Sequence, residues 1–188
     1  MTVLYLVRHA HADYVPDEQR PLSAQGVVAA GRVAGLLGQL PVRAIYASPY
    51  RRAWQTVESL AGKLGLPLRF EPDLRERTLG RLPAELDFAA AVRQTWADPA
   101  FAHPAGETNA AAQRRGVAVV QRLLAQHPDQ RLVLATHGNL LALVLQHFDP
   151  GVGYAFWQSL TMPDVYELRV EGDAASFRRL WRGEALES

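Results

Sequence analysis

Two histidines, His9 and His11, stand two positions apart in the stretch VRHAHAD, which covers residues 7–13. Together with Asp13 they offer ligand types that bind zinc, at the His-x-His-x-Asp spacing that begins the metal site of several hydrolases. The same stretch places Arg8 directly before His9, and a guanidinium next to an imidazole suits the binding and attack of a phosphoryl group. These residue types therefore allow two kinds of chemistry, one with a metal ion and one with phosphate.

A metal site is the weaker of these two alternatives. A tetrahedral zinc site needs three or four ligands, yet Asp13 is followed by Tyr14 rather than by a further histidine. Arg8 and Arg52 would also bring positive charge close to a divalent cation, which costs electrostatic energy. We therefore expect no catalytic metal.

Phosphate chemistry has a use for each of these side chains. An imidazole such as that of His9 attacks phosphorus through one ring nitrogen when an acceptor holds its other N–H group. Negative charge is spread over the equatorial oxygens of the transferring phosphoryl group, so fixed positive donors must surround it. We expect Arg8, Arg52 and a cationic His137 to form that ring. We expect Glu76 to protonate the leaving oxygen.

The residues with this chemistry lie in five short blocks, namely Arg8-His9, SPYRRAWQT (48–56), LRERTLG (74–80), HPAGET (103–108) and THGN (136–139). Their order resembles the histidine phosphatase superfamily, which includes cofactor-dependent phosphoglycerate mutases and many small phosphatases. The resemblance extends from residue 3 to about residue 145 and implies a phosphoglycerate mutase-like fold. It implies that His9 becomes a phosphohistidine and that Glu76 protonates the leaving oxygen and then helps to activate water. It implies further that Arg8, Arg52 and His137 hold the phosphoryl group, and that hydrolysis needs neither a metal nor an organic cofactor.

Departures from the family pattern favour a small phosphatase. Ala10 stands where the family often has glycine, and Val15 stands where phosphoglycerate mutases have an asparagine that contacts phosphate. Mutases also have longer insertions that keep water from the intermediate, so the short chain predicts phosphate monoester hydrolysis. The first alternative is phosphoglycerate mutase-type phosphoryl transfer.

Two further alternatives remain. The run RPLSAQG (20–26) resembles the short bacterial phosphohistidine-protein phosphatases, although an acid such as Glu76 suits phosphate monoesters better. A phosphate-binding regulatory module without activity is the non-enzymatic alternative. The intact set of chemical groups at residues 8, 9, 52, 76 and 137 favours an enzyme, a phosphoric monoester hydrolase.

Other residues are candidates for the substrate pocket. His11 follows the nucleophile, Asn139 follows the second His-Gly pair, and His103 and Glu107 lie in the block HPAGET. The irregular segment 77–105 mixes charge, proline and aromatic residues, and long loops in compact domains tend to be functional. We predict that this segment forms a substrate lid. The expected partner is a small phosphorylated metabolite, with a phosphohistidine protein as the alternative.

Alternating strands and helices must position these residues. Apolar strands are predicted over residues 2–7, 43–48, 66–72 and 131–136, with a closing pair over 164–172 and 175–182. Helices are predicted over residues 24–39, 49–64, 84–97 and 107–127, and from 139 to before 149. The first helix has Ser23 as N-cap and an apolar pattern at Val27, Val28, Val33, Leu36 and Leu37. The fold class is therefore α/β, a three-layer α/β/α sandwich with a mainly parallel central sheet and helices on both faces. Ligands bind at the carboxyl ends of the strands in such sheets.

Composition limits the remaining function classes. The length of 188 residues predicts one domain over 1–188, and the net charge of +1 gives no reason to expect nucleic acid. The chain has no cysteine, which excludes disulfides and thiolate metal sites. No apolar run has the length of a membrane span, and no signal peptide follows Met1. We expect a cytoplasmic monomer or homodimer that binds neither nucleic acid nor membranes.

Overall fold

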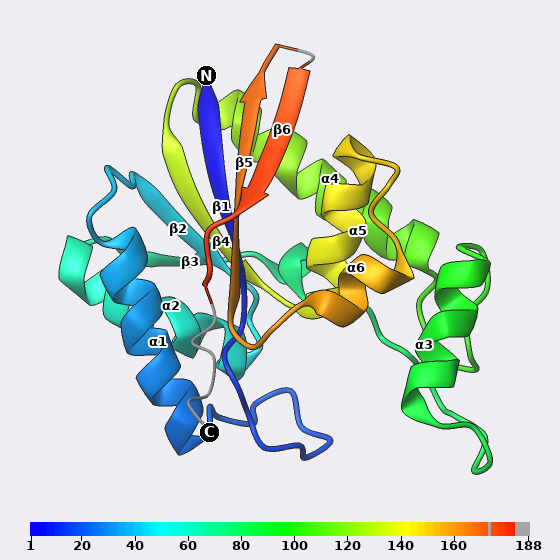
Figure 1. Ribbon diagram of the computed structural model, residues 1–188. Coiled ribbons are helices and arrows are strands. Elements are labelled where there is room, and N and C mark those ends of the chain that lie inside the picture. Colours follow the sequence, from blue (N-terminus) through cyan, green and yellow to red (C-terminus); the bar gives the residue numbers. More distant parts are fainter. Residues whose placement is uncertain (173, 183–188) are drawn as a thin grey trace.

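The computed structural model describes residues 1–172 and 174–182 and has a six-stranded central sheet in the order β3-β2-β4-β1-β5-β6 (Figure 1). Four strands are parallel to one another, namely β1 (Thr2–Arg8), β2 (Ala44–Ala47), β3 (Leu68–Phe70) and β4 (Arg131–Thr136). Strand β5 (Asp164–Glu171) runs antiparallel to both of its neighbours, β1 and β6 (Ala174–Arg179). The predicted mainly parallel sheet is confirmed.

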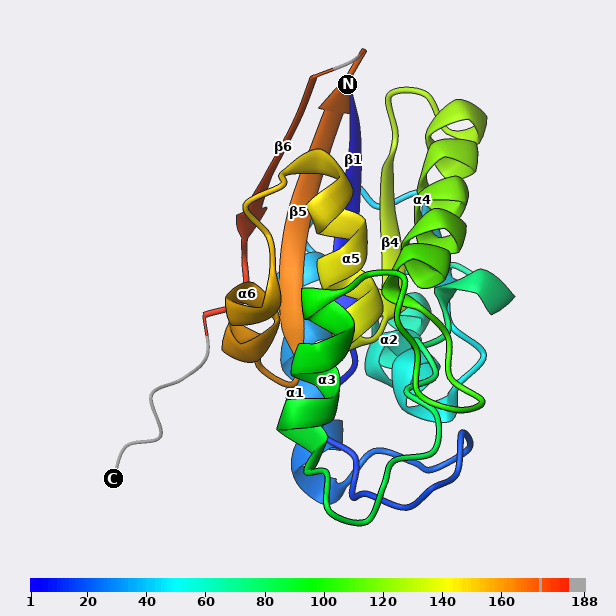
Figure 2. The same ribbon diagram turned by 90° about the vertical axis from the view of Figure 1, so that its right-hand side faces the viewer.

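Helices cover both faces of this sheet, as Figures 1 and 2 show. Successive residues of a strand point to opposite faces, so Leu4 and Leu6 of β1 pack with α4 and α5, whereas Tyr5 and Val7 pack with α1 and α2. The predicted three-layer sandwich is therefore confirmed. The helices are, in chain order, α1 (Ala24–Leu37), α2 (Arg51–Leu64), α3 (Phe88–Ala97), α4 (Asn109–Gln126), α5 (Gly138–Phe148) and α6 (Tyr154–Ser159).

Helix α1 begins as predicted, but only part of its predicted apolar pattern is buried. The Ser23 hydroxyl accepts a hydrogen bond from the backbone N–H of Gly26, which confirms the N-cap. Val27 and Val28 of the apolar pattern are 58% and 60% exposed, and Leu36 is also exposed. Val33 and Leu37 of the same pattern are buried as predicted. Gly26, Ala30 and Ala34 complete the buried face, and α1 approaches the loop after β1 closely at Gly26. A Cβ atom on Gly26 would lie 2.0 Å from the carbonyl oxygen of His11.

The middle of the chain departs most from prediction. Helix α3 begins only after Asp87, whose carboxylate caps it, and α4 begins after its N-cap Thr108. The 3-10 turn η1 (Pro72–Leu74) and α6 are too short for the helical period to show in the sequence. Within the described ranges, 1–172 and 174–182, no helix combines the length and the apolar character needed to cross a membrane.

The arrangement of β1 and β4 determines where a ligand binds. These strands are neighbours in the sheet, but α1 follows β1 on one face and α5 follows β4 on the opposite face. After the carboxyl ends of β1 and β4 the chain therefore turns to opposite faces of the sheet, and this leaves a crevice between the two strand ends. Strand β1 ends at Arg8 and is followed by His9, and β4 is followed by His137-Gly138.

Candidate active site

His9 is fixed to the sheet and held in one tautomer. Its backbone N–H extends the β1–β4 ladder to the carbonyl of Thr136 at 3.0 Å. Its ring Nδ1 lies 2.7 Å from the carbonyl of Ala10, and a carbonyl only accepts, so Nδ1 carries the proton. The other nitrogen, Nε2, accepts a hydrogen bond from Nε of Arg52 at 3.3 Å. Nε2 therefore has the lone pair that a nucleophile needs.

The surroundings of His9 keep its ring neutral. The side chain is 7% exposed. Burial lowers the pKa of His9 to about 3, with further lowering by the charges of Arg52, Arg8 and Arg20 against a raising contribution from the bond to Ala10. A neutral imidazole is the form that can attack phosphorus.

Helix α2 presents Arg52 to this ring. Arg52 lies in the first turn of the helix, and burial lowers its pKa to about 10, so it is cationic at neutral pH. One turn further on, the Thr56 hydroxyl donates to the carbonyl of Arg52 and accepts from the backbone N–H of Ala10. This threonine ties the start of α2 to the histidine loop. Arg51 points to solvent.

His137 is the second imidazole of the site. It is fully buried between β4 and α5, and its ring centroid lies 5.2 Å from that of His9. Its Nε2 is 2.8 Å from the Ser48 hydroxyl, whereas its Nδ1 has no partner. Burial lowers the pKa of His137 well below its usual value, followed by the effects of His9 and Arg52. The expected cationic His137 is therefore wrong for the free protein, because the ring is buried among other cations.

Arg8 reaches the site from the last position of β1. Its Nη1 donates to the carbonyl of Leu160 at 2.9 Å, and its Nε has no partner. The guanidinium lies directly against the start of α5, where a Cβ atom on Gly138 would be 2.9 Å from Cζ of Arg8. The glycine after His137 is thus explained, because any side chain there would displace Arg8.

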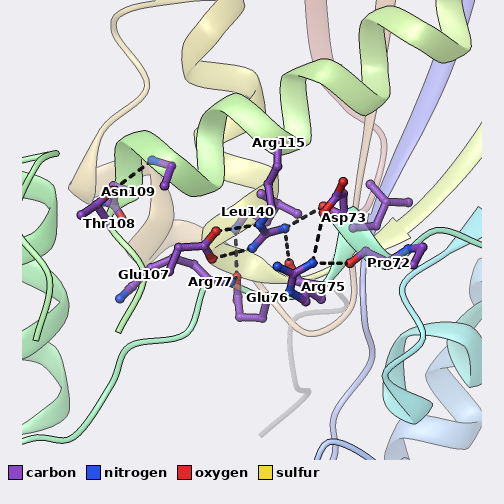
Figure 3. Close-up of polar contacts among 12 residues, drawn as sticks. Pro72, Asp73, Arg75, Glu76, Arg77, Glu107, Thr108, Asn109, Arg115 and Leu140 are labelled. Atoms are coloured by element: carbon purple, nitrogen blue, oxygen red, sulfur yellow. Dashed lines mark hydrogen bonds and ion pairs between the residues drawn. The ribbon is translucent and has the colours of Figure 1, made fainter. Parts of the chain in front are cut away.

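Glu76 lies at the amino-terminal end of α5. Its Oε2 accepts from the backbone N–H of Asn139 at 3.0 Å, and its Oε1 accepts from Leu140 at 3.0 Å and from Arg77 at 2.9 Å (Figure 3). These bonds use the free N–H groups of a helix N-terminus and fix the position of the carboxyl group. Oε2 accepts only one bond and so has the greater remaining capacity to exchange a proton.

Arg115 of α4 holds the chain on both sides of this acid. Figure 3 shows its guanidinium between Glu107 and the segment that contains Glu76. Nε and Nη2 bind the two carboxylate oxygens of Glu107 at 2.8 Å each, and Nη1 donates to the carbonyls of Asp73 and Arg75. Burial raises the pKa of Glu107, but its bond to Arg115 and the charge of Arg115 lower it by more. Glu107 is thus an ionised anchor for Arg115.

These groups line one cavity of about 660 Å³. Its polar wall contains Arg8, His9, Arg52 and Glu76, and its remaining wall is largely apolar. Four lining residues outside the predicted lid were missing from the candidates drawn from the sequence: Tyr14, Arg20, Trp157 and Met162. Arg77 lies within the predicted lid but was not singled out there as a site residue. A signal existed for Arg20, which begins the run RPLSAQG, and for Arg77, which adjoins Glu76. Trp157 lies on the short α6 and had none.

The four additional pocket candidates separate into two groups. Asn139 lines the cavity. The other three do not, and their placement in the pocket is corrected. His11 bonds through Nδ1 to the Ser23 hydroxyl, His103 is buried with Nε2 near the carbonyl of Ala91, and Glu107 faces a separate cavity beside Thr78. Each of these side chains is engaged with a neighbouring loop or helix.

The two histidines of VRHAHAD do not converge as metal ligands. His9 bonds to Ala10, His11 bonds to Ser23, and Asp13 is exposed. In the part of the chain that the structure describes, no three His, Asp or Glu side chains form a group able to hold a metal ion.

The same part of the chain has five buried side-chain atoms without a hydrogen-bond partner, and all are nitrogens of this site. They are Nε of Arg8, Nε of Arg20, Nε and Nη1 of Arg77, and Nδ1 of His137. Three of these four residues line the cavity, and the fourth contacts His9. Buried polar groups are nearly always paired in native proteins. The four guanidinium nitrogens among these five atoms can only donate, so their concentration marks a place for an anion.

Comparisons with known proteins agree with this geometry. The family model of the histidine phosphatase superfamily (branch 1) matches residues 4–181. A glucosyl-3-phosphoglycerate phosphatase of Mycobacterium tuberculosis is 30% identical over 159 residues, covering 74% of this chain and 71% of that protein. A protein of Hydrogenobacter thermophilus with the provisional name phosphoserine phosphatase 2 is 26% identical and covers 94% of this chain and 93% of its own.

A solved structure extends the likeness to three dimensions. The native structure of a mycobacterial glucosyl-3-phosphoglycerate phosphatase superposes with a TM-score of 0.75 at 26% identity, covering 95% of this chain and 96% of that one. The relatives are phosphatases, and the family model covers nearly the whole sequence. The chain therefore belongs to the histidine phosphatase superfamily, branch 1, and is a phosphatase, a phosphoric monoester hydrolase, of that superfamily.

Proposed function

We propose that this phosphatase hydrolyses phosphate monoesters through a covalent phosphohistidine on His9, without a metal ion. The observation that carries the proposal is the set of buried, unpaired nitrogens around the cavity. A buried cation without a partner is costly, and a phosphoryl group with three peripheral oxygens supplies the missing acceptors.

The first step transfers the phosphoryl group to the protein. The lone pair on Nε2 of His9 forms the bond to phosphorus, while the bond from phosphorus to the ester oxygen breaks. Glu76 donates a proton to that leaving oxygen, so the product leaves as an alcohol. Arg52 turns its hydrogen bond from Nε2 to a phosphoryl oxygen, and Arg8 and His137 bind the other oxygens.

The second step returns the protein to its starting state. Glu76, now ionised, takes a proton from a water molecule as the water oxygen attacks phosphorus. The bond between phosphorus and Nε2 breaks, inorganic phosphate leaves, and His9 is again neutral. The bond from Nδ1 to the Ala10 carbonyl keeps the ring in the required tautomer through both steps.

The substrate in this proposal is a small phosphorylated metabolite. Segment 77–105 acts as its lid, since Leu79, Leu82, Phe88 and Val92 of that segment line the cavity. The relatives are named for glucosyl-3-phosphoglycerate and phosphoserine. Both compounds are organic phosphate esters, and an apolar wall suits the organic part of such an ester.

Phosphate release from p-nitrophenyl phosphate and from a panel of phosphorylated metabolites tests the proposal. We expect activity that is unchanged in EDTA and that is abolished by His9→Ala. His147→Ala, at an exposed histidine of α5, is the matched control and should retain activity. Activity lost in EDTA and restored by zinc, or full turnover by the His9→Ala protein, would contradict the proposal. Interconversion of 3-phosphoglycerate faster than phosphate release would favour mutase-type transfer instead.

A further inference from the structure

Arg77 differs from the other arginines of the cavity. Its side chain is 5% exposed, lines the cavity, and has both Nε and Nη1 buried without a partner. Arg8 donates to the carbonyl of Leu160, and Arg52 donates to His9. No hydrogen bond from the Arg77 guanidinium is found within residues 1–172 and 174–182, so most of its donors remain to be satisfied by a ligand.

Arg77 lies beside the acid of the cavity. Its backbone N–H donates to Oε1 of Glu76 at 2.9 Å, and both side chains line the cavity. Burial lowers the pKa of Arg77, and the opposing contributions come from Glu76 and Glu107. Arg77 thus belongs to the same side of the cavity as the acid, where the organic part of an ester would extend from the leaving oxygen.

We propose that Arg77 determines substrate specificity by binding a carboxylate that the substrate has in addition to its phosphate. This inference rests on the proposed function and narrows its substrate class to phosphate esters of hydroxy acids. One guanidinium matches one carboxylate in charge and forms paired hydrogen bonds with it. A second phosphate has about twice that charge, which one guanidinium does not balance.

The apolar lining around Arg77 strengthens this interaction. Leu79, Leu82, Phe88 and Trp157 line the same cavity, and Arg77 is buried. An ionic hydrogen bond is stronger where water is excluded. The same surroundings disfavour a substrate that has a neutral group at this position, because the buried nitrogens of Arg77 then stay unpaired.

A pair of substrates that differ at one carbon tests the proposal. 3-Phosphoglycerate has a carboxylate where glycerol 3-phosphate has a hydroxymethyl group. We expect the wild-type kcat/KM to be higher for 3-phosphoglycerate, and Arg77→Met to reduce the ratio of the two kcat/KM values by about tenfold or more. Arg77→Lys, which keeps the charge but loses the fork, should reduce the ratio less. Arg81→Met, at an exposed arginine of the same segment, is the control and should leave the ratio unchanged.

The outcomes separate this inference from the function on which it rests. Lack of phosphate release by the wild type from either ester and from p-nitrophenyl phosphate would contradict the proposed function itself. Another outcome is that the wild type hydrolyses both esters while Arg77→Met shows the same ratio of the two kcat/KM values as the wild type. That result would overturn only the role of Arg77, whether the two kcat/KM values of the variant are unchanged or are lowered equally. Inhibition by inorganic phosphate is a second readout. An inhibition constant that rises as much as kcat/KM falls would place Arg77 at the transferring phosphoryl group and overturn the proposal.

Discussion

The two sides of the cavity are built in different ways. On the histidine side, defined by Arg8, His9, Arg52 and His137, each group follows directly from a strand end or a first helical turn. The backbone of His9 continues the sheet ladder to Thr136. On the acid side, defined by Glu76 and Arg77, the chain is irregular and is held by side chains, above all by Arg115.

This difference has a consequence for catalysis. The sheet fixes the groups that we propose bind and attack phosphorus. The acid side depends on a few bonds between side chains and loop carbonyls, so it is the side on which a leaving group can be selected. Variants on the histidine side should therefore affect all substrates alike, whereas variants on the acid side should affect substrates according to their leaving group.

The largest effect in this comparison is expected from Arg52→Met. Removal of its cation from the phosphoryl oxygens should lower kcat/KM by about 100-fold to 1,000-fold for every ester tested, because fixed donors stabilise the transition state. Arg51→Met removes the neighbouring exposed arginine and should retain wild-type kinetics. Equal losses in the two variants would contradict the assignment of Arg52.

Glu76→Gln should show the dependence on leaving group. The amide oxygen can still accept from Leu140 and Arg77 in the place of Oε1, although the amide nitrogen cannot accept from Asn139, so the loop should largely keep its position. Loss of the acid should lower kcat about 100-fold for an alkyl phosphate, within the usual range for general acid catalysis. A smaller loss is expected for p-nitrophenyl phosphate, whose leaving group departs without a proton. Parallel losses for both substrates would exclude Glu76 as the acid.

Arg115→Met should give a weaker form of the same behaviour. The variant leaves Glu107 without its ionic partner and frees the carbonyls of Asp73 and Arg75, so we expect a loss of about 2–3 kcal/mol in the free energy of unfolding. Arg115 is a positioning residue, so the alkyl phosphate should lose more activity than p-nitrophenyl phosphate.

Arg114→Met, at the adjacent exposed position of α4, is the control for this experiment. It should retain both stability and the ratio of the two activities. A stability loss in Arg115→Met with an unchanged ratio of activities would show that Arg115 supports the fold without positioning Glu76.

The smallest effect concerns stability as a function of pH. In the folded protein the pKa of His9 is about 3, and in the unfolded chain it is about 6.5. Between these values the unfolded chain binds a proton that the folded protein does not, so stability falls as the pH falls from about 6.5 towards 3. In His9→Asn the slope should decrease by up to about 1.4 kcal/mol per pH unit, measured by denaturant unfolding. An unchanged slope would show that His9 is not buried in the neutral form.

The histidine side was predictable from the sequence because its residues sit at fixed positions after apolar strands. Parallel strands meet with their carboxyl ends at one edge, so Arg8, His9, Arg52 and His137 were expected together. The charge state of His137 was not predictable from the sequence. The cost of burying a charged imidazole depends on tertiary packing, which no local sequence pattern reveals.

The acid side was predictable only in part. The block LRERTLG indicated Glu76, but its contact with α5 joins residues 64 positions apart, and no periodicity records it. His103 and Glu107 were placed in the pocket because their segment was expected to be a lid. The structure instead uses them to hold loops and helices together. Asn139 was placed correctly because it follows His137 directly.

The most direct test of the account is detection of the phosphoryl group on His9 during turnover. Wild-type protein is mixed rapidly with a phosphate monoester and quenched in alkali, and the peptide that contains His9 is analysed by mass spectrometry. We predict that His9 gains one acid-labile phosphoryl group, which forms and disappears fast enough to account for turnover. Turnover without any phosphoryl group on the protein, or with that group on another residue, would contradict the account.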